Sequence, residues 1–254
     1  MKKVTVKGLF IALLALVLFV TMAVVASAQE AAIVESGTCG DNLTWTLDSE
    51  GTLTVSGNGY IYGDLLKGPF CEKSLIKKAV IEQGVYDIGA YTFQDCENLT
   101  SVSLPNGITT IDNYVFSSCH NLKDITIPNT VRSIQQGTFS DCSSLTSIVI
   151  PEGVEEIGWA AFSRCSSLTS VHIPTSVTFI ALEAFADCNN ISDVYYAGSK
   201  AQWNSIHFGN EGEGNEALLN ANIHFASSDS GKELNFFQRI IQWFRNLFAR
   251  LFGR

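Results

Sequence analysis

The sequence of 254 residues lacks the motifs by which most enzymes and cofactor proteins are detected. Its four histidines stand apart, and none belongs to an HExxH motif or a nucleophile elbow. No glycine-rich loop has the spacing that cradles phosphate, and no CxxC or Cys/His spacing typical of a metal site occurs. We therefore expect no enzyme activity, no catalytic residue, no bound metal and no cofactor.

Positive charge is scarce in the body of the chain. Residues 29–233 hold all 25 acidic residues but only nine lysines and arginines, a net charge of −16. This balance argues against nucleic acid as a partner, because nucleic-acid binding relies on basic side chains. Residues 234–254 are the opposite, with four arginines and no acid.

Long apolar runs are absent except near the N-terminus. Lys2, Lys3 and Lys7 precede an apolar run over 9–25, and the small residues Ala26-Ser27-Ala28 follow it. This pattern predicts a secretory signal peptide over 1–28, cleaved after Ala28. An uncleaved membrane anchor is the alternative, since the run approaches spanning length. The signal predicts a secreted, cell-surface-associated protein.

What the sequence does contain is a strict repeat of 23 residues. Four kinds of apolar position keep this step over five units, namely Phe93, Phe116, Phe139, Phe162 and Phe185; Cys96, Cys119, Cys142, Cys165 and Cys188; Leu99, Leu122, Leu145, Leu168 and Ile191; and Ile88, Ile111, Ile134, Ile157 and Ile180. Such a period predicts one supersecondary unit stacked on copies of itself, which is a repeat solenoid. Solenoids mostly present extended binding surfaces, which again disfavours an enzyme.

The unit over 97–119 illustrates one coil. We expect a short parallel strand over 99–104, ended by Pro105, which lacks a backbone donor. A second extended piece follows over 108–111, and a helical turn from Tyr114 delivers the next Phe and Cys inward. A single coil cannot offset the entropy of ordering its backbone, so neighbouring coils must share their apolar layers.

The remaining segments predict two caps and a tail. Residues 36–59 alternate apolar and polar side chains around a turn at 48–51, as a β-hairpin does. The predicted organisation begins with a signal peptide over 1–28, a β-rich N-terminal cap over 29–76 and a repeat array of about five units over 77–197. A C-terminal cap follows over 198–226, with a helix near 201–206 and a strand near 221–225. The chain then continues with a polar linker over 227–233 and an amphipathic basic helix over 234–254.

Five of the seven cysteines belong to the repeat. In stacked coils their side chains point inward in parallel, an orientation that fits disulfide geometry poorly, so we expect a ladder of buried thiols. Cys39 and Cys71 lie outside the array and could pair with each other.

One unit carries the motif I-x4-F-x2-C-x2-L-x2-V-x-I-P, seen in Ile134, Phe139, Cys142, Leu145, Ile148, Ile150 and Pro151. This motif resembles the BspA-like leucine-rich repeats of bacterial cell-surface proteins. The segments 37–59 and 194–206 are also similar to segments that flank such arrays, so the resemblance covers about 37–225. It implies export, surface display and adhesion, and it supplies no catalytic residues.

The outward strand positions form the candidate binding face. They are mostly small and polar, and they comprise Lys78, Ser101, Ser103, Asp124, Thr126, Ser147, Val149, Ser170, His172, Asp193 and Tyr195, with Val80 in the leading unit. Such a face suits a polypeptide or a glycan better than an apolar ligand. The alternative is a solvated face with no partner.

The tail is a second candidate contact surface. Phe237, Ile240, Ile241, Phe244, Leu247, Phe248 and Leu251 follow helical spacing and form one broad apolar face, with arginines on or beside the other. The pattern fits a helix lying in a membrane interface, and docking on the array or on a partner's helix are its rivals. The sequence thus predicts a non-catalytic surface binding protein; the alternative is an envelope spacer without a soluble ligand, attached through this helix.

Overall fold

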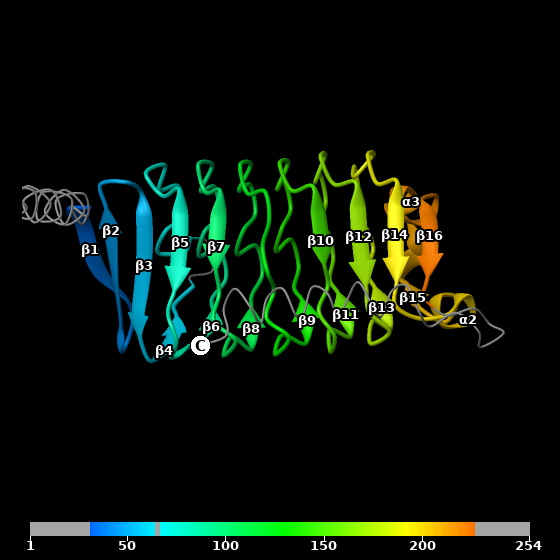
Figure 1. The fold of residues 1–254 in the computed structure, drawn as a ribbon, viewed down its shortest axis with the longest axis horizontal. Helices are drawn as coiled ribbons and strands as arrows, with labels where there is room; N and C mark the ends of the chain where they lie inside the picture. The colour runs from blue at the N-terminus through cyan, green and yellow to red at the C-terminus, as the bar shows by residue number, and fades with distance from the viewer. Residues whose placement is uncertain (1–30, 64–66, 227–254) are drawn as a thin grey trace, which may run out of the picture.

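The computed structural model describes residues 31–63 and 67–226. The predicted signal peptide, linker and basic helix lie outside these residues. The described chain forms a solenoid whose coils follow one another along a single axis (Figure 1). Within residues 31–63 and 67–226, no helix is both long and apolar enough to cross a membrane.

The N-terminal end is a three-stranded antiparallel sheet made of β1 (Ile33–Gly40), β2 (Leu43–Asp48) and β3 (Thr52–Gly57). β2 and β3 form the predicted hairpin. The Asp48 carboxylate accepts backbone hydrogen bonds from Glu50 (2.9 Å) and Thr52 (2.8 Å), which closes the turn. β3 then pairs in parallel with the first strand of the array, so this hairpin covers the open edge of the stack.

One side of the solenoid carries the longer parallel strands. These are β5 (Lys78–Ile81), β7 (Ser101–Ser103), β10 (Ser147–Val149), β12 (Ser170–Ile173), β14 (Asp193–Tyr196) and β16 (Asn222–Phe225). Lys78 lies opposite Ser101, and Ser170 lies opposite Asp193, a step of one 23-residue repeat each time. The parallel solenoid and its period are confirmed.

The predicted series of strands is broken at one coil. Residues 122–128 form no strand, and the sheet divides into β1-β2-β3-β5-β7 and β10-β12-β14-β16. The Lys123 N–H reaches the Thr100 carbonyl at 3.5 Å, the outer limit of a hydrogen bond, so the ladder is not continued there. The expectation that Asp124 and Thr126 lie on a strand is therefore wrong, although Ile127 stays buried and keeps this coil in the stack.

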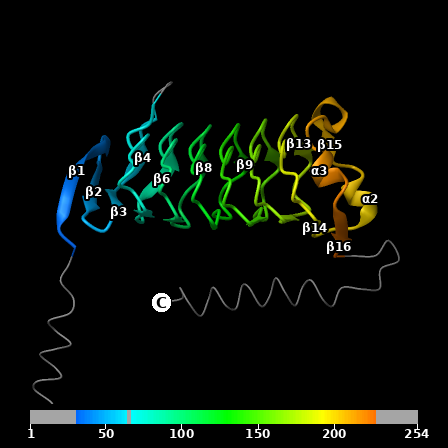
Figure 2. The same cartoon turned by 90° about the horizontal axis from the view of Figure 1, so that it is seen from above.

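A second side carries shorter strands. They are β4 (Gly59–Ile61), β6 (Val85–Ile88) and β8 (Thr110–Ile111) in one sheet, and β9 (Ser133–Ile134), β11 (Glu156–Ile157), β13 (Phe179–Ile180) and β15 (His207–Phe208) in another. Figure 2 shows this row of short strands along a side of the coils different from that of β14 and β16.

The helical turn expected from Tyr114 takes the form of consecutive tight turns. The Ser117 N–H bonds to the Tyr114 carbonyl and the Cys119 N–H to the Phe116 carbonyl, both at 3.2 Å. Tyr114 (φ 56°) and Ser118 (φ 59°) are left-handed, a conformation that interrupts an α-helix. The N–H of Phe116 instead reaches the Thr138 carbonyl of the next coil at 2.9 Å, so these turns hold neighbouring coils together.

A ladder of phenylalanine rings fills the interior. Phe70, Phe93, Phe116, Phe139, Phe162 and Phe185 are fully buried, and neighbouring ring centroids lie 5.1–5.5 Å apart. The rings are stacked, as the period predicts, and Phe70 adds a rung before Phe93.

The cysteine ladder runs beside the rings and is also confirmed. Each repeat thiol donates a hydrogen bond to the carbonyl of a phenylalanine in the preceding coil, at 3.0–3.2 Å. Burial raises the pKa of Cys96 to about 12, so its thiol stays protonated. All seven cysteines are free, Cys39 and Cys71 included, and the possible pairing of those two is not formed.

The C-terminal end is closed by α2 (Lys200–Trp203), a 3-10 helix η1 (Gly209–Gly212) and α3 (Glu216–Leu219). A capping box at Ser199 starts α2. Asn215 is fully buried: its side-chain oxygen accepts from the Phe185 N–H and its amide donates to the Ala181 carbonyl, each at 3.0 Å. This side chain therefore replaces the backbone that a further coil would supply.

Candidate binding face

On the side with the longer strands, alternation points two rows of side chains outward from the two sheets, and Asp124 and Thr126 lie in the coil between these sheets. The predicted face residues are all at least partly exposed, namely Lys78, Ser101, Ser103, Asp124, Thr126, Ser147, Val149, Ser170, His172, Asp193 and Tyr195. The solenoid thus brings together residues spread over more than 110 positions of the sequence. We call this surface the sheet face.

Three aromatic rings stand in a row at the C-terminal end of the sheet face. The parallel register puts His172 beside Tyr195 and Tyr195 beside His224. The His172 and Tyr195 ring centroids are 4.6 Å apart at 14°, and those of Tyr195 and His224 are 4.7 Å apart at 16°. We call these three residues the ring ladder. Val149, 60% exposed, lies opposite His172 and extends the ladder with an apolar side chain.

A charged group supports the ring ladder. The Asp193 carboxylate lies 2.7 Å from His224 Nε2, and it accepts a second bond from the Ser192 hydroxyl, also at 2.7 Å. The bond to His224 is the main cause that lowers the pKa of Asp193. Partial burial lowers the pKa of His172, which favours its neutral ring. The end of the face therefore combines apolar ring area, a neutral imidazole and a carboxylate.

The N-terminal part of the sheet face is different. Its outward side chains at Ser101 and Ser103 are short, and Lys78 on β5 is exposed. Large rings and the histidine–carboxylate pair thus occur at one end only of the described face.

Sequence reasoning missed His224 as a face residue. The last step of the sheet, from Tyr195 to its partner His224, is 29 residues rather than 23, because the helices of the cap are inserted in the last coil. The predicted strand near 221–225 was the available signal, but its register on β14 could not be read from the period.

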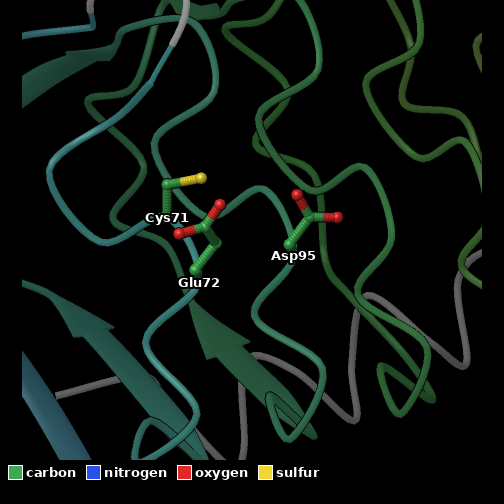
Figure 3. A group of neighbouring side chains, drawn as sticks. All are labelled: Cys71, Glu72 and Asp95. Carbon is green, nitrogen blue, oxygen red and sulfur yellow. The ribbon is translucent and has the colours of Figure 1, made fainter.

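A second cluster lies near the N-terminal end of the array (Figure 3). One ligand-type atom from each of Cys71, Glu72 and Asp95 lies within 4.8 Å of the others. Glu72 and Asp95 are both left-handed, one repeat apart, and this shared backbone position brings them together. However, Lys67 Nζ already pairs with the Glu72 carboxylate at 2.6 Å, and burial raises the pKa of the Cys71 thiol. We therefore assign no metal to this cluster.

The repeat chemistry matches a known family. The model of the "BspA type Leucine rich repeat region" matches six copies over residues 66–192. The chain belongs to this family. The six copies begin within the coil that contains Phe70, the additional rung of the ring stack. Leucine-rich-repeat proteins of this kind are generally non-enzymatic, which agrees with the missing catalytic motifs.

Solved structures show the same fold in other leucine-rich-repeat proteins. A leucine rich cell surface protein from Faecalibacterium prausnitzii is 30% identical, with a TM-score of 0.53, over 66% of this chain and 41% of that one. A leucine-rich repeat protein from Eubacterium ventriosum is 24% identical, with a TM-score of 0.56, over 64% of this chain and 44% of that one. The Treponema pallidum leucine rich repeat protein is 25% identical, with a TM-score of 0.50, over 62% and 83%.

This BspA-type chain spans less than half the length of the first two of those proteins. No curated protein sequence matches it.

Proposed function

We propose that this BspA-type chain is a non-catalytic surface protein that binds a polypeptide or glycan through the sheet face. The ring ladder is the observation that carries the proposal. Binding energy in protein interfaces concentrates on a few aromatic and charged side chains, whereas serine and threonine contribute little. His172, Tyr195 and His224 supply such side chains next to Asp193. A surface role is supported by the family and by the cell surface protein among its structural relatives.

A binding screen with matched variants tests this proposal. The full chain is applied to arrays of immobilised extracellular-matrix proteins and of glycans, together with a His172→Ala/Tyr195→Ala variant and a Ser101→Ala/Ser103→Ala variant. We expect a bound ligand whose signal the first variant loses and the second largely keeps. A ligand that binds both variants equally well would place recognition elsewhere, and no ligand on either array would reject this function.

The alternative function is an envelope spacer without a soluble ligand. The unbroken stack of six phenylalanine rings favours it, because a continuous packed core suits a stiff rod. Under this alternative, the ring-ladder substitutions have no binding phenotype, while deletion of one complete 23-residue unit changes the span of the protein. The array screen therefore separates the two functions.

We further propose that residues 234–254 hold the protein at a membrane interface and that residues 1–28 direct its export. The support is the sequence pattern alone: seven apolar side chains at helical spacing, and an apolar run behind three lysines. Flotation of liposomes with the full chain and with a 1–233 truncation tests the membrane contact. Only the full chain should float, and equal flotation of both, or of neither, would reject it.

A further inference from the structure

The short-strand side of the solenoid contains a hollow that no part of the proposed function uses. It has a volume of about 480 Å³, within the range of pockets that hold small molecules. Its lining includes Tyr60 on β4, Asp87 on β6, Tyr91 in the following turn, and Asp112 and Asn113 after β8. We call it the tyrosine–aspartate hollow.

The repeat explains why this hollow forms in the first coils. Ala90 and Asn113, one repeat apart, line it, whereas the equivalent positions of the later coils hold the larger Gln136, Trp159 and Leu182. The neighbouring Gly63 has its backbone against Ala90, since a Cβ there would lie 2.3 Å from the Ala90 nitrogen. Small residues where other coils carry long side chains leave the space open.

Two tyrosine rings are held beside the space. Tyr60 is 46% exposed and contacts the Tyr62 ring at a centroid distance of 4.6 Å. A hydrogen bond with Asp41 raises the pKa of Tyr62 to about 12, so Tyr62 remains a neutral support for Tyr60. Tyr91 stacks on Tyr114 at 5.3 Å and 7°, which fixes the orientation of its ring.

Two acidic residues, Asp87 and Asp112, line the same hollow, and only one oxygen of each carboxylate is hydrogen-bonded within the described residues. One oxygen of Asp87 accepts from the Thr109 hydroxyl at 2.7 Å, and one oxygen of Asp112 accepts from the Asn113 N–H at 2.7 Å. Within the described part of the chain, the second oxygen of each carboxylate has no hydrogen-bond partner, and neither acid has an ion pair. The lining contains no lysine, arginine or histidine.

We propose that the tyrosine–aspartate hollow binds the cationic end of an arginine or lysine side chain from a polypeptide partner. Tyrosine faces attract a guanidinium or ammonium group through their negative π-systems, and a desolvated cation gains most from such contacts. Free carboxylate oxygens accept the charge-assisted hydrogen bonds that these cations donate. Tyr60 lies directly beside Asp87 on the neighbouring strand, so ring and carboxylate can contact one cation together. An anionic ligand would meet two carboxylates and no compensating positive charge.

Titration of the full chain with small probes tests this proposal. The probes are Nα-acetylarginine methylamide, Nα-acetyllysine methylamide and the uncharged Nα-acetylcitrulline methylamide, which has nearly the shape of the arginine probe. Binding is followed by calorimetry and by protein NMR shifts. We expect saturable binding of at least one cationic probe and about tenfold weaker binding of citrulline. The tighter cationic probe identifies which side chain the partner supplies. Equal binding of citrulline and arginine, or no saturable binding of either cation, would overturn the proposal.

Matched variants place the binding in the hollow. Asp87→Asn/Asp112→Asn should weaken the tighter cationic probe about tenfold or more, whereas Glu152→Gln, at an exposed acid of a later coil, should leave it within about twofold. Tyr60→Phe should retain binding and Tyr60→Leu should lose it. Unchanged binding in the double variant would overturn the assignment.

Folding and independence are checked in the same experiments. Circular dichroism melting curves establish that the variants are folded. If the double variant does not fold, the salt dependence of binding to the wild-type protein provides the test. Binding of a cation next to carboxylates should weaken clearly between about 50 and 500 mM salt. Salt-independent binding would contradict the proposal. Since the hollow and the sheet face lie on different sheets, loss of ligand by the ring-ladder variant leaves this result unaffected.

Discussion

The interior and the sheet face of this solenoid obey different rules. Inside, the five coils from Phe93 to Phe185 repeat the same ring and the same thiol, and all of these side chains are fully buried. Outside, the coils diverge, from Ser101 and Ser103 at one end to His172 and Tyr195 at the other. Each interior side chain must fit its own copy one coil away, whereas an outward side chain meets solvent. The difference teaches that recognition should be sought where the repeat changes.

Adjacent parallel strands are about 4.8 Å apart, close to the thickness required by stacked aromatic rings. The interior rings stack at 5.1–5.5 Å and the outward rings at 4.6–4.7 Å. The same strand spacing therefore serves stability inside and builds the ring ladder outside.

The largest expected effect is at the centre of the interior. Phe139→Ala removes a fully buried ring that stacks on Phe116 and Phe162, and it should lower the free energy of unfolding by about 3–5 kcal/mol. Urea denaturation measures the change. The outward Ser147→Ala variant in the next strand should stay within about 0.5 kcal/mol. Similar losses in the two variants would break the contrast between interior and face.

A smaller loss is expected where the interior ends. Asn215→Ala leaves the Phe185 N–H without its partner, while the Ala181 carbonyl keeps its bond from the Ala184 N–H at 3.3 Å, so the change should cost about 1–3 kcal/mol. Hydrogen exchange should show that the substitution accelerates exchange of the Phe185 amide much more than exchange of the Phe116 amide. Asn106→Ala, at an exposed position, is the matched control. Unchanged exchange at Phe185 would show that the cap does not depend on this side chain.

The thiol ladder should contribute less per rung. Cys142→Ala removes a buried sulfur and its 3.2 Å hydrogen bond to the Phe116 carbonyl, and it should destabilise the protein by about 1–2 kcal/mol. Chemical denaturation under reducing conditions measures this value. A stability equal to that of the wild type would mean that neither the packing nor the hydrogen bond of this thiol stabilises the fold.

The smallest effect is a pH dependence on the sheet face. Partial burial lowers the pKa of His172, so the folded protein favours its neutral form. The resulting stability is present above the unfolded pKa of about 6.5 and declines as pH falls below it. Melting temperatures between pH 7 and 5 should therefore fall slightly more in the wild type than in His172→Asn. Parallel curves would show that His172 titrates freely.

Most of the interior could be predicted from the sequence, because the repeat of apolar residues can be read from the sequence without knowledge of the fold. The 23-residue step identified the phenylalanine and cysteine ladders and the outward positions of His172 and Tyr195. It did not identify Phe70, because the leading unit has lost the cysteine at the matching position, where Lys73 stands. Nor did it detect the missing strand at 122–128, whose apolar pattern equals that of its neighbours.

By itself, the sequence determined a parallel solenoid of 23-residue coils, since only stacking can bury an apolar pattern that no single coil can cover. Tertiary structure alone decided three further features. A 29-residue final step sets His224 against Tyr195, Asn215 takes the place of a missing backbone, and small residues leave a hollow between Tyr60 and Asp112. These features depend on which residues of different coils are in contact. An insertion or a smaller side chain changes those contacts without changing the 23-residue period.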